Sequence, residues 1–355
     1  MTVSETPIRK RSAIVANLRR SIARGDYSPG SRLPTRVELE KTFAASSATV
    51  QHALDSLKKD GVIFPKGNLG TFVSDRPPHL FRYALIVPHR PDDPEHWSHF
   101  WRALRSEAVA GKDASQQIEV FFGSDEYPAH PDSARLMEDL DAHRLAGLIF
   151  ASSPFHLLRS PLITRPDVHR VAIMDKPDVP GVPAIFPDTR DFLNKALDHL
   201  RSRGRQRIAI LGVDAGESFY QHFVAGATVR GQVTHPYWIQ ILSPPLTHGV
   251  QNCAHLLMSG SRDERPDGLI IADDNLVPSA TAGLLSAGIR VPVDADVVAH
   301  ANFPWPTQSV VPAYRIGFDA RTIVNRCIES IVQQRRNEPP VPLTLIPAVA
   351  ESERK

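Results

Sequence analysis

The sequence predicts two folded parts: a small α+β head of the winged helix-turn-helix class, and a larger α/β body of two lobes with doubly wound parallel sheets. Three observations support this. Residues 8–74 show three helical patterns and then two short strands around a glycine-punctuated turn. Residues 84–299 alternate short apolar strands with helical stretches. Two adjacent prolines, Pro77 and Pro78, separate these regions.

These patterns give expected boundaries for the whole chain of 355 residues. We expect a head at residues 1–75, a linker at 76–82, a body at 83–347 and a polar, frayed tail at 348–355. Because of its prolines, the linker is expected to be stiff and extended. It is either a plain spacer or a tether that transmits motion of the body to the head.

The head begins with an amphipathic helix. Ile14, Leu18 and Ile22 recur at helical spacing and form one apolar stripe, and Gly25 ends the pattern. Thr35 and the glutamate three residues later have the spacing of a capping box, which starts a second helix.

A third helix is expected to begin after Ser46, a residue type that caps helix N-termini. Its buried face consists of Val50, Ala53, Leu54 and Leu57. Ser47, Thr49, Gln51 and His52 then point mainly outward near the helix start. Short polar side chains in that place can reach base edges and phosphates in a DNA major groove.

A strand, a turn at residues 66–68 and a second strand follow, which is the pattern of a wing. Residues 1–75 contain 12 Lys/Arg and 7 Asp/Glu, a net charge of +5, whereas the whole chain is +2. The basic excess therefore lies in the head, as phosphate binding requires. The candidate DNA-contacting residues are Arg9, Arg32, Thr35, Arg36, Ser46, Ser47, Thr49, Gln51, His52, Lys66, Gly67 and Asn68. The alternative is a small helical domain that binds a protein.

The head resembles the GntR family of bacterial winged-helix regulators. The residues that support this are Pro29-Gly30, Leu33-Pro34, Thr49-Val50, Ala53-Leu54, Gly61 and Gly70-Thr71-Phe72-Val73. The sequence departs from the family at Val37, Ser47 and Gln51, where an arginine is usual, although Arg36 lies one residue from the first of these. The usual operator half-site of the family is therefore not assumed.

The body alternates strands and helices along its length. Expected strands lie at 84–87, 118–122, 147–150, 171–174, 208–211, 268–271 and 297–299. Expected helices lie at 97–110, 133–144, 190–203, 248–259 and 276–287. Short apolar strands separated by helices indicate parallel sheets covered on both faces, and seven of them suit two subdomains better than one sheet. Ligands of such sheets bind beyond the carboxyl ends of the strands.

The body resembles the effector-binding region of the LacI/GalR regulators, which is similar to periplasmic sugar-binding proteins. The segments that support this are 88–90, 199–212, 266–274 and 287–298. The resemblance implies two lobes joined by three strands, an effector in the cleft between them, and a homodimer. Phe223 stands where the family has a sugar-gripping arginine, and Ala301 stands where it has a carboxylate.

The ligand site is therefore expected to be rebuilt with other side chains. The candidates are Arg90, Trp97, Ser152, Asp175, Tyr220, His222, Phe223, Asp274, His300, Asn302 and Trp305. Aromatic rings can stack on the apolar face of a sugar, while Asp and Asn can bind pairs of hydroxyls. For each residue the alternative is core packing or a solvated loop.

A GntR-type head on a LacI-type body is the arrangement of arabinose-responsive regulators. The resemblance implies a homodimer that binds double-stranded operator DNA, a small carbohydrate effector, and repression rather than activation. One alternative is a regulator that senses a purine or an amino acid, which Phe223 in place of arginine favours. Another is a sugar-modifying enzyme.

Several motifs of enzymes are missing from the sequence. There is no nucleophile elbow, no Walker motif and no dinucleotide-binding glycine pattern. Asp273 and Asp274 could be a catalytic pair, but adjacent residues at a strand end usually point apart. His96 and His99 have helical spacing without an accompanying carboxylate or thiol cluster. We therefore expect no enzyme, no metal and no cofactor.

The location of the protein is also constrained by the sequence. The first ten residues are polar, and no apolar run approaches the length of a membrane helix, so we expect a cytoplasmic protein without a membrane partner. Cys253 and Cys327 are far apart in expected helices, and two buried reduced thiols are the simplest interpretation.

Overall fold

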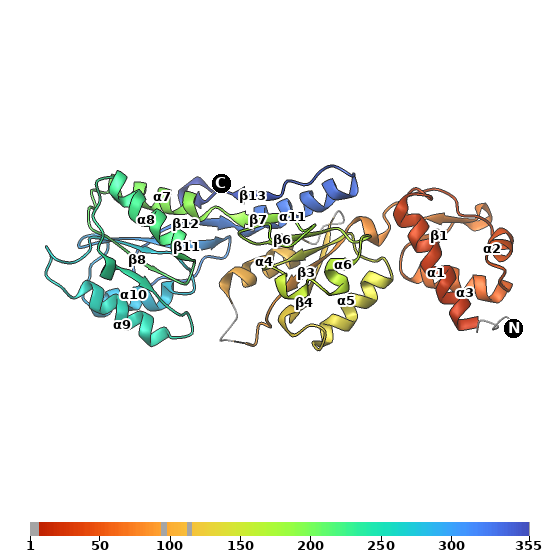
Figure 1. Ribbon diagram of the computed structural model, residues 1–355, viewed down its shortest axis with the longest axis horizontal. Helices are drawn as coiled ribbons and strands as arrows, with labels where there is room; N and C mark the ends of the chain where they lie inside the picture. Colours follow the sequence, from red (N-terminus) through yellow and green to blue (C-terminus); the bar gives the residue numbers. More distant parts are fainter. Residues whose placement is uncertain (1–6, 94–97, 112–115, 355) are drawn as a thin grey trace. The chain divides into compact units, whose positions relative to one another are not determined.

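The computed structural model of the protein describes residues 7–93, 98–111 and 116–354 (Figure 1). The chain forms two compact units by contact clustering. Unit 1 comprises residues 1–88, 108–172 and 330–340, and unit 2 comprises residues 89–107, 173–329 and 341–355.

Unit 1 contains the head, whose elements follow the expected order. They are α1 (Pro7–Arg24), α2 (Arg36–Phe43), α3 (Ser47–Lys59), β1 (Ile63–Pro65) and β2 (Thr71–Val73). β1 and β2 pair antiparallel and form the wing. The apolar stripes of α1 and α3 meet in one core that includes Leu18 and Leu57, each almost fully buried. This burial fixes which face of α3 remains outside.

The caps of the head helices agree with the sequence. The Thr35 side chain accepts a hydrogen bond from the Glu38 amide, and the Glu38 carboxylate accepts one from the Thr35 amide at 2.7 Å, so a capping box begins α2. The Ser46 hydroxyl accepts a hydrogen bond from the Thr49 amide at 3.3 Å and begins α3. Both helix starts are therefore held by local hydrogen bonds.

The first sheet of the body has six strands in the order β13-β7-β6-β5-β3-β4. The strands are β3 (Arg82–Val87), β4 (Gln117–Phe122), β5 (Gly147–Phe150), β6 (Arg170–Ile173), β7 (Ala184–Pro187) and β13 (Leu343–Ile346). The pairs β3–β4, β3–β5, β5–β6 and β7–β13 are parallel. The helices around this part of the chain are α4 (His99–Ala110), α5 (Pro131–Asp141) and α6 (Pro161–Thr164).

The second sheet has six strands in the order β14-β12-β11-β10-β8-β9. They are β8 (Ile208–Gly212), β9 (Ile239–Ile241), β10 (Gly268–Ile271), β11 (Asp296–Phe303), β12 (Tyr314–Asp319) and β14 (Val349–Ala350). Its helices are α7 (Thr189–Ser202), α8 (Glu217–Val229), α9 (Thr247–Met258) and α10 (Val277–Ser286), and α11 (Ala320–Arg335) follows β12. In Figure 1, α9 and α10 lie on one face of this sheet, and α7 and α8 lie on the other.

The predicted doubly wound parallel sheets are confirmed, and each of the seven expected strands is present. Strands β7, β9, β12, β13 and β14 and helices α6, α8 and α11 were not among the expected elements. The expectation of a frayed tail is wrong for the described part: β14 pairs with β12, and Ala350 is buried. The linker is not simply extended, since residues 78–80 form a 3-10 turn with Pro77 and Pro78 buried.

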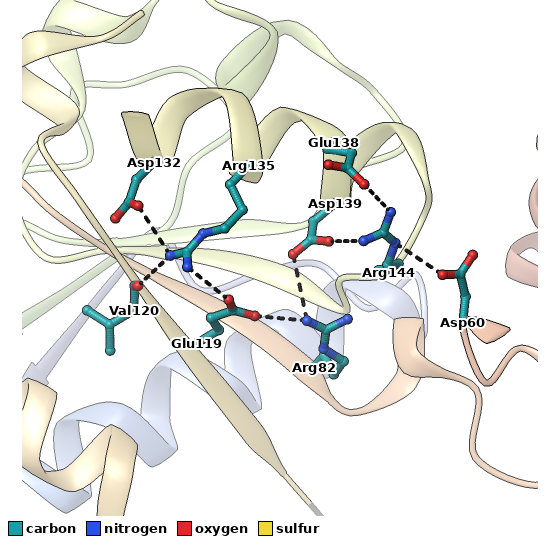
Figure 2. A network of polar contacts seen from close by, with 9 residues as sticks. All are labelled: Asp60, Arg82, Glu119, Val120, Asp132, Arg135, Glu138, Asp139 and Arg144. Carbon is teal, nitrogen blue, oxygen red and sulfur yellow. Dashed lines mark hydrogen bonds and ion pairs between the residues drawn. The ribbon is translucent and has the colours of Figure 1, made fainter. Parts of the chain in front are cut away.

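A network of ion pairs in unit 1 reaches from the head into the first sheet (Figure 2). Asp60, the C-cap of α3, pairs with Arg19 of α1 and lies 3.9 Å from the Arg144 Nε. Arg144 also donates to the buried Asp139 at 2.8 Å, and Arg82 of β3 lies 3.7 Å from the same carboxylate. Because Asp139 faces two guanidinium groups, its negative charge is compensated although burial raises its pKa.

No helix in the described part of the chain is long and apolar enough to cross a membrane. Among the same residues, no group of three His, Cys, Asp or Glu side chains is placed to hold a metal ion. Cys327 is fully buried, but Cys253 is only half-buried, so the expectation of two buried thiols is correct for one of them.

Candidate nucleic-acid interface and ligand site

A groove on the head brings several of the predicted DNA-contacting residues together. It has a volume of about 320 Å³ and lies between the start of α2, the exposed side of α3 and the wing. Arg32, Thr35, Arg36 and Gln51 all line it. A groove with two guanidinium groups and an amide on its walls presents donors to the phosphates and base edges of DNA.

Two of the predicted DNA-contacting side chains also hold helix starts. The Thr35 hydroxyl donates to the Glu38 carboxylate at 2.8 Å, and the Ser46 hydroxyl lies 2.9 Å from the Thr49 hydroxyl. These groups are therefore engaged in capping. Ser47, Gln51 and His52 are exposed on α3 and carry the polar face of this helix.

Gln51 has a partner that fixes its amide. Its Nε2 donates to the Asp55 carboxylate at 3.0 Å, one helical turn later. The spacing of four residues places both side chains on the same face of α3. The Gln51 carbonyl oxygen remains the acceptor through which this residue could contact DNA, while Asp55 adds a negative charge beside it.

The wing presents its cation at an exposed turn. Lys66 lies 5.7 Å from the ring centre of Phe72 and is exposed, as are Gly67 and Asn68. Arg32 lies against Gly70, where an added Cβ would come within 2.9 Å of its Nε. Gly70 also has a φ of +110°, so only glycine suits this position well.

The remaining predicted contacts lie on α1 and α2. Arg36 forms an ion pair with Glu40 at 3.4 Å while half of its side chain stays exposed. Arg9 falls in the first turn of α1, and its side chain lies outside the described residues.

A cluster of polar side chains in unit 2 is the candidate ligand site. Asp274, in the segment that follows β10, is 1% exposed. Its Oδ2 accepts hydrogen bonds from the Asn302 amide at 2.8 Å and from the Thr307 hydroxyl at 3.4 Å. The Thr307 hydroxyl is 2.8 Å from Nδ1 of His99, whose backbone amide donates to Asn275 at 3.0 Å. We refer to Asp274, Asn302, Thr307 and His99 as the Asp274 cluster.

Burial is the main cause of the unusual protonation of Asp274. It raises the pKa of this carboxyl to about 7, and the neighbouring charge of Asp273 acts in the same direction. The hydrogen bonds from Asn302 and Thr307 lower the pKa but do not offset the burial. Near neutral pH this group therefore exchanges between a hydrogen-bond donor and an acceptor-only carboxylate.

This pKa has a consequence for stability. An unfolded aspartate has a pKa of about 3.9. Between about pH 4 and about pH 7 the folded chain therefore holds a proton that the unfolded chain has lost. The contribution of Asp274 to the free energy of unfolding should therefore fall as pH rises through this window. We expect Asp274→Asn to gain stability relative to the wild type from pH 4 to pH 7, measured by urea unfolding at each pH. A constant difference would contradict the raised pKa.

A second buried carboxylate lies near this cluster in unit 2. Glu107 of α4 is 5% exposed. It accepts a hydrogen bond from the Trp305 indole at 3.2 Å and forms an ion pair with Arg321 at 2.9 Å. Half of Trp305 remains exposed, so its ring offers a surface on which a ligand could stack.

The other predicted ligand residues are distributed differently. Phe223 is fully buried in the core of unit 2, and Tyr220 is almost buried with its hydroxyl donating to the Val213 carbonyl at 2.5 Å. His300 packs between Phe192 and Phe318, with ring-centre distances of 5.4 and 5.6 Å. The structure therefore joins Asp274 and Asn302 directly, while Phe223 contributes to packing.

Two of the predicted ligand residues are histidines with a buried ring nitrogen that makes no hydrogen bond among the described residues. The buried Nδ1 of His300 and Nε2 of His222 have no hydrogen-bond partner among the described residues. Arg90 is half-exposed and pairs with Asp92 at 3.2 Å. Ser152 is partly exposed and Asp175 is exposed. Trp97, like His96, lies outside the described residues.

Sequence reasoning missed several residues that the structure places in these sites. His99 and Thr307 belong to the Asp274 cluster although they are 208 residues apart. No local pattern marks Thr307, and His99 was considered only for its helical spacing from His96. By contrast, the partnership of Gln51 with Asp55 follows from their helical spacing and could have been predicted.

Comparisons with known proteins agree with this geometry. The family model "Bacterial regulatory proteins, gntR family" matches residues 2–73, a range that includes the three helices and the wing. A regulator of Escherichia coli, the uncharacterized HTH-type transcriptional regulator YieP, is 33% identical over 60 residues, or 17% of this chain and 26% of its own. The N-terminal part of the chain is therefore a GntR-type winged-helix head.

The body has relatives of a second type. The model "Periplasmic binding protein-like domain" matches residues 197–351. An arabinose metabolism transcriptional repressor of Halalkalibacterium halodurans is 22% identical, covering 92% of this chain and 91% of its own. The chain therefore resembles that repressor over nearly the whole length of both proteins.

Solved structures show the same fold for the body. A LacI-family regulator of Chloroflexus aggregans gives a TM-score of 0.60 at 17% identity, covering 76% of this chain and 96% of its own. A LacI-family regulator of Lactobacillus casei with bound glucose gives a TM-score of 0.55 at 16% identity, covering 76% and 98%. The GntR-type head is thus joined to a two-lobed α/β body like that of LacI-family proteins.

Proposed function

We propose that this regulator is a ligand-responsive repressor whose affinity for operator DNA changes when a small polar molecule binds at the Asp274 cluster. The observation that carries the proposal is the buried Asp274 carboxyl, held by Asn302 and Thr307, in a body attached to a GntR-type head. Burying a carboxyl group costs free energy unless hydrogen-bond partners compensate for the lost water. A ligand that offers hydroxyl groups would supply such partners.

A carbohydrate is the ligand class that we favour. Carboxyl and amide groups bind pairs of hydroxyls, and the half-exposed Trp305 ring can stack on a sugar. One relative is named as a repressor of arabinose metabolism, and a structure of similar fold holds glucose. Phe223, at the position of the family's sugar-gripping arginine, is buried in the core and keeps a second candidate open, a purine or an amino acid.

The regulator would act as a cytoplasmic homodimer. Two heads would bind the halves of a pseudo-palindromic operator, and the effector would shift operator affinity only as far as its affinities for the two states of the body differ. A panel of sugars, purines and amino acids tested by thermal shift, followed by operator binding with each positive compound, tests the proposal. A compound that stabilises the protein without changing operator affinity would count against it.

The wing should contribute a phosphate contact through Lys66. We expect Lys66→Ala to weaken operator and non-specific DNA binding by a similar factor and to lower the salt slope by about one, because phosphate contacts do not read sequence. Fluorescence anisotropy over a range of salt concentrations measures both quantities. Lys176→Ala, a change at an exposed lysine of the body, is the control. Full affinity of the Lys66 variant at every salt concentration would remove the wing from the interface.

Base discrimination should reside in Gln51. We expect Gln51→Arg to change the preferred operator, because arginine pairs with guanine whereas glutamine suits adenine, at about 1–3 kcal/mol for a good bidentate pair. Selection from a random DNA library measures the preference of each protein. Gln51→Ala, which should relax the preference without creating a new one, is the control. The same consensus for wild type and Gln51→Arg would exclude α3 as the reading helix.

A further inference from the structure

A cavity in unit 1 lies where the head meets the part of the body that is built on the first sheet. We refer to this part of the body as the first lobe. The cavity has a volume of about 240 Å³. Its walls come from the end of α1, the 3-10 turn of the linker, the chain around α5 and β5, residues 167–169 and the end of α11. We refer to it as the junction cavity. It shares no residue with the Asp274 cluster or with the groove on the head.

The polar walls of the junction cavity are mainly basic. The basic and titratable nitrogen-bearing side chains that line it are Arg24, His79, His143, His169 and Arg335. Asp167 is the acidic residue of the lining. Arg165 binds both oxygens of this carboxylate, at 3.3 and 3.1 Å, so its charge is already compensated. The cavity therefore has an excess of positive charge over negative charge.

The histidines of the cavity are kept neutral by their surroundings. Burial lowers the pKa of His79 to about 4, with the charge of Arg335 as the next cause. Burial also lowers the pKa values of His143 and His169. An anion in the cavity would oppose each of these effects, since a nearby negative charge favours the protonated imidazole.

Two hydrogen bonds and one unusual backbone conformation distinguish Arg335 and His143 in the cavity wall. The Arg335 Nη1 donates to the Leu80 carbonyl at 3.1 Å, and the guanidinium also hydrogen-bonds the Tyr83 side chain. These two contacts fix the guanidinium at the wall, and N–H groups of the same fork remain. His143 has a φ of +47°, a left-handed conformation that is uncommon outside glycine and costs free energy. Strained positions of this kind are found more often at binding sites than elsewhere.

We propose that the junction cavity is a second binding site of this regulator, for a small phosphate-bearing metabolite. Guanidinium groups bind phosphate through two parallel hydrogen bonds, and neutral imidazoles add N–H donors. Its volume lies below the range of about 300–1,000 Å³ that is typical for drug-sized ligands, so the molecule is a phosphate on a small body. Ile22 and Leu140 line the cavity and supply apolar contact for that body.

The site connects the head to the body because both line it. Arg24 belongs to α1, whereas His143, His169 and Arg335 belong to the first lobe. A bound phosphate therefore favours the arrangement in which the head packs against the lobe, and its effect on DNA affinity follows from that preference. The binding itself does not depend on the proposed function, whereas the effect on operator affinity rests on it.

The experiment uses the full chain and inorganic phosphate as the probe. Isothermal titration calorimetry at constant ionic strength, with chloride replacing phosphate in the blank, measures the dissociation constant. We expect Arg335→Gln and Arg24→Gln each to weaken phosphate binding at least tenfold. Arg336→Gln, a change at the exposed neighbour outside the cavity, is the matched control and should bind as the wild type does.

Two outcomes would overturn the site. One is the absence of phosphate binding to the wild type, and the other is equal binding by all three variants, which would indicate an adventitious ion only. Because Arg335 also binds Leu80, its variant is checked for folding by circular dichroism, and Arg24, which is exposed, serves as the second variant. Operator affinity with and without phosphate is measured separately. No change in the wild type would overturn the regulatory role while binding stands.

Discussion

Replacing Asp274 with alanine is expected to abolish the response to the effector while the ligand-free protein keeps its operator affinity. The carboxyl is almost fully buried, and its hydrogen bonds run to Asn302 and Thr307 within unit 2. Without it, ligand hydroxyls would lose their partner at about 1–3 kcal/mol each, or on the order of tenfold to hundredfold in affinity. The phosphate contacts of the head do not involve this residue.

The measurement is operator affinity with and without an effector found in the ligand panel. Asp263→Ala, a change at an exposed aspartate of the same unit, should respond as the wild type does and controls for the loss of a negative charge. Thermal unfolding of the ligand-free variants separates a lost ligand contact from a lost fold. An Asp274→Ala protein that still responds fully would show that the ligand binds elsewhere.

The largest expected loss of stability follows from Gly317→Ala. Gly317 of β12 pairs with Ala301 of β11, and a Cβ at this position would overlap the backbone carbonyl of Ala301. The two strands would have to separate, because a backbone atom cannot rotate away as a side chain can. We expect a loss of about 3 kcal/mol or more in the free energy of unfolding, near the upper end for overpacking. Since Asn302 follows Ala301, the effector response should weaken as well.

Urea unfolding followed by circular dichroism measures this loss. Gly249→Ala in α9 is the matched control, because its Cβ would make only an ordinary contact of 3.6 Å with the Leu246 Cβ. Alanine also favours a helix over glycine by up to about 1 kcal/mol. The control should therefore be neutral or more stable. A Gly317→Ala protein as stable as the wild type would mean that β11 and β12 do not approach this closely.

The features that could be predicted from the sequence depend on residues close together in the chain. Thr35 and Glu38 form their capping box within one helical turn, and Ser46 caps α3 through Thr49. Short continuous apolar strands such as Leu148–Phe150 of β5 are visible because both faces of their sheet are covered. Local spacing is sufficient to determine such elements.

The hydrogen bonds of the Asp274 cluster join residues that are far apart in the chain, so local spacing does not predict them. Asp274 was a candidate through the resemblance to the LacI/GalR regulators, but its partners lie 28 and 33 residues later: Asn302 near the end of β11, and Thr307 after that strand. His99, which also belongs to the cluster, donates its backbone amide to Asn275, a residue 176 positions later in the chain. Hydrogen bonds over such separations depend on the packing of the sheets, which no pattern in one sequence encodes.

The missed strands have a related cause. β14 has only two residues, which is too short to show an apolar pattern. β7 has an apolar run but ends in Pro187, a residue type that argues against a strand inside a sheet. β13 and β14 are edge strands, so each has one hydrogen-bonded neighbour in its sheet. Gly317 is a further case, because its close approach to Ala301 leaves no trace in the sequence apart from the glycine itself.

The last two strands affect the order in which the protein can fold during synthesis. β13 pairs with β7 at the edge of one sheet and β14 pairs with β12 at the edge of the other, and both follow every other strand in the chain. A ribosome adds about 5–20 residues per second, and domains that emerge early fold early. The head can therefore fold while the body is still being made. β7 and β12 each lack one hydrogen-bonded neighbour until residues 343–350 emerge, and their free backbone groups can pair with another chain during this interval.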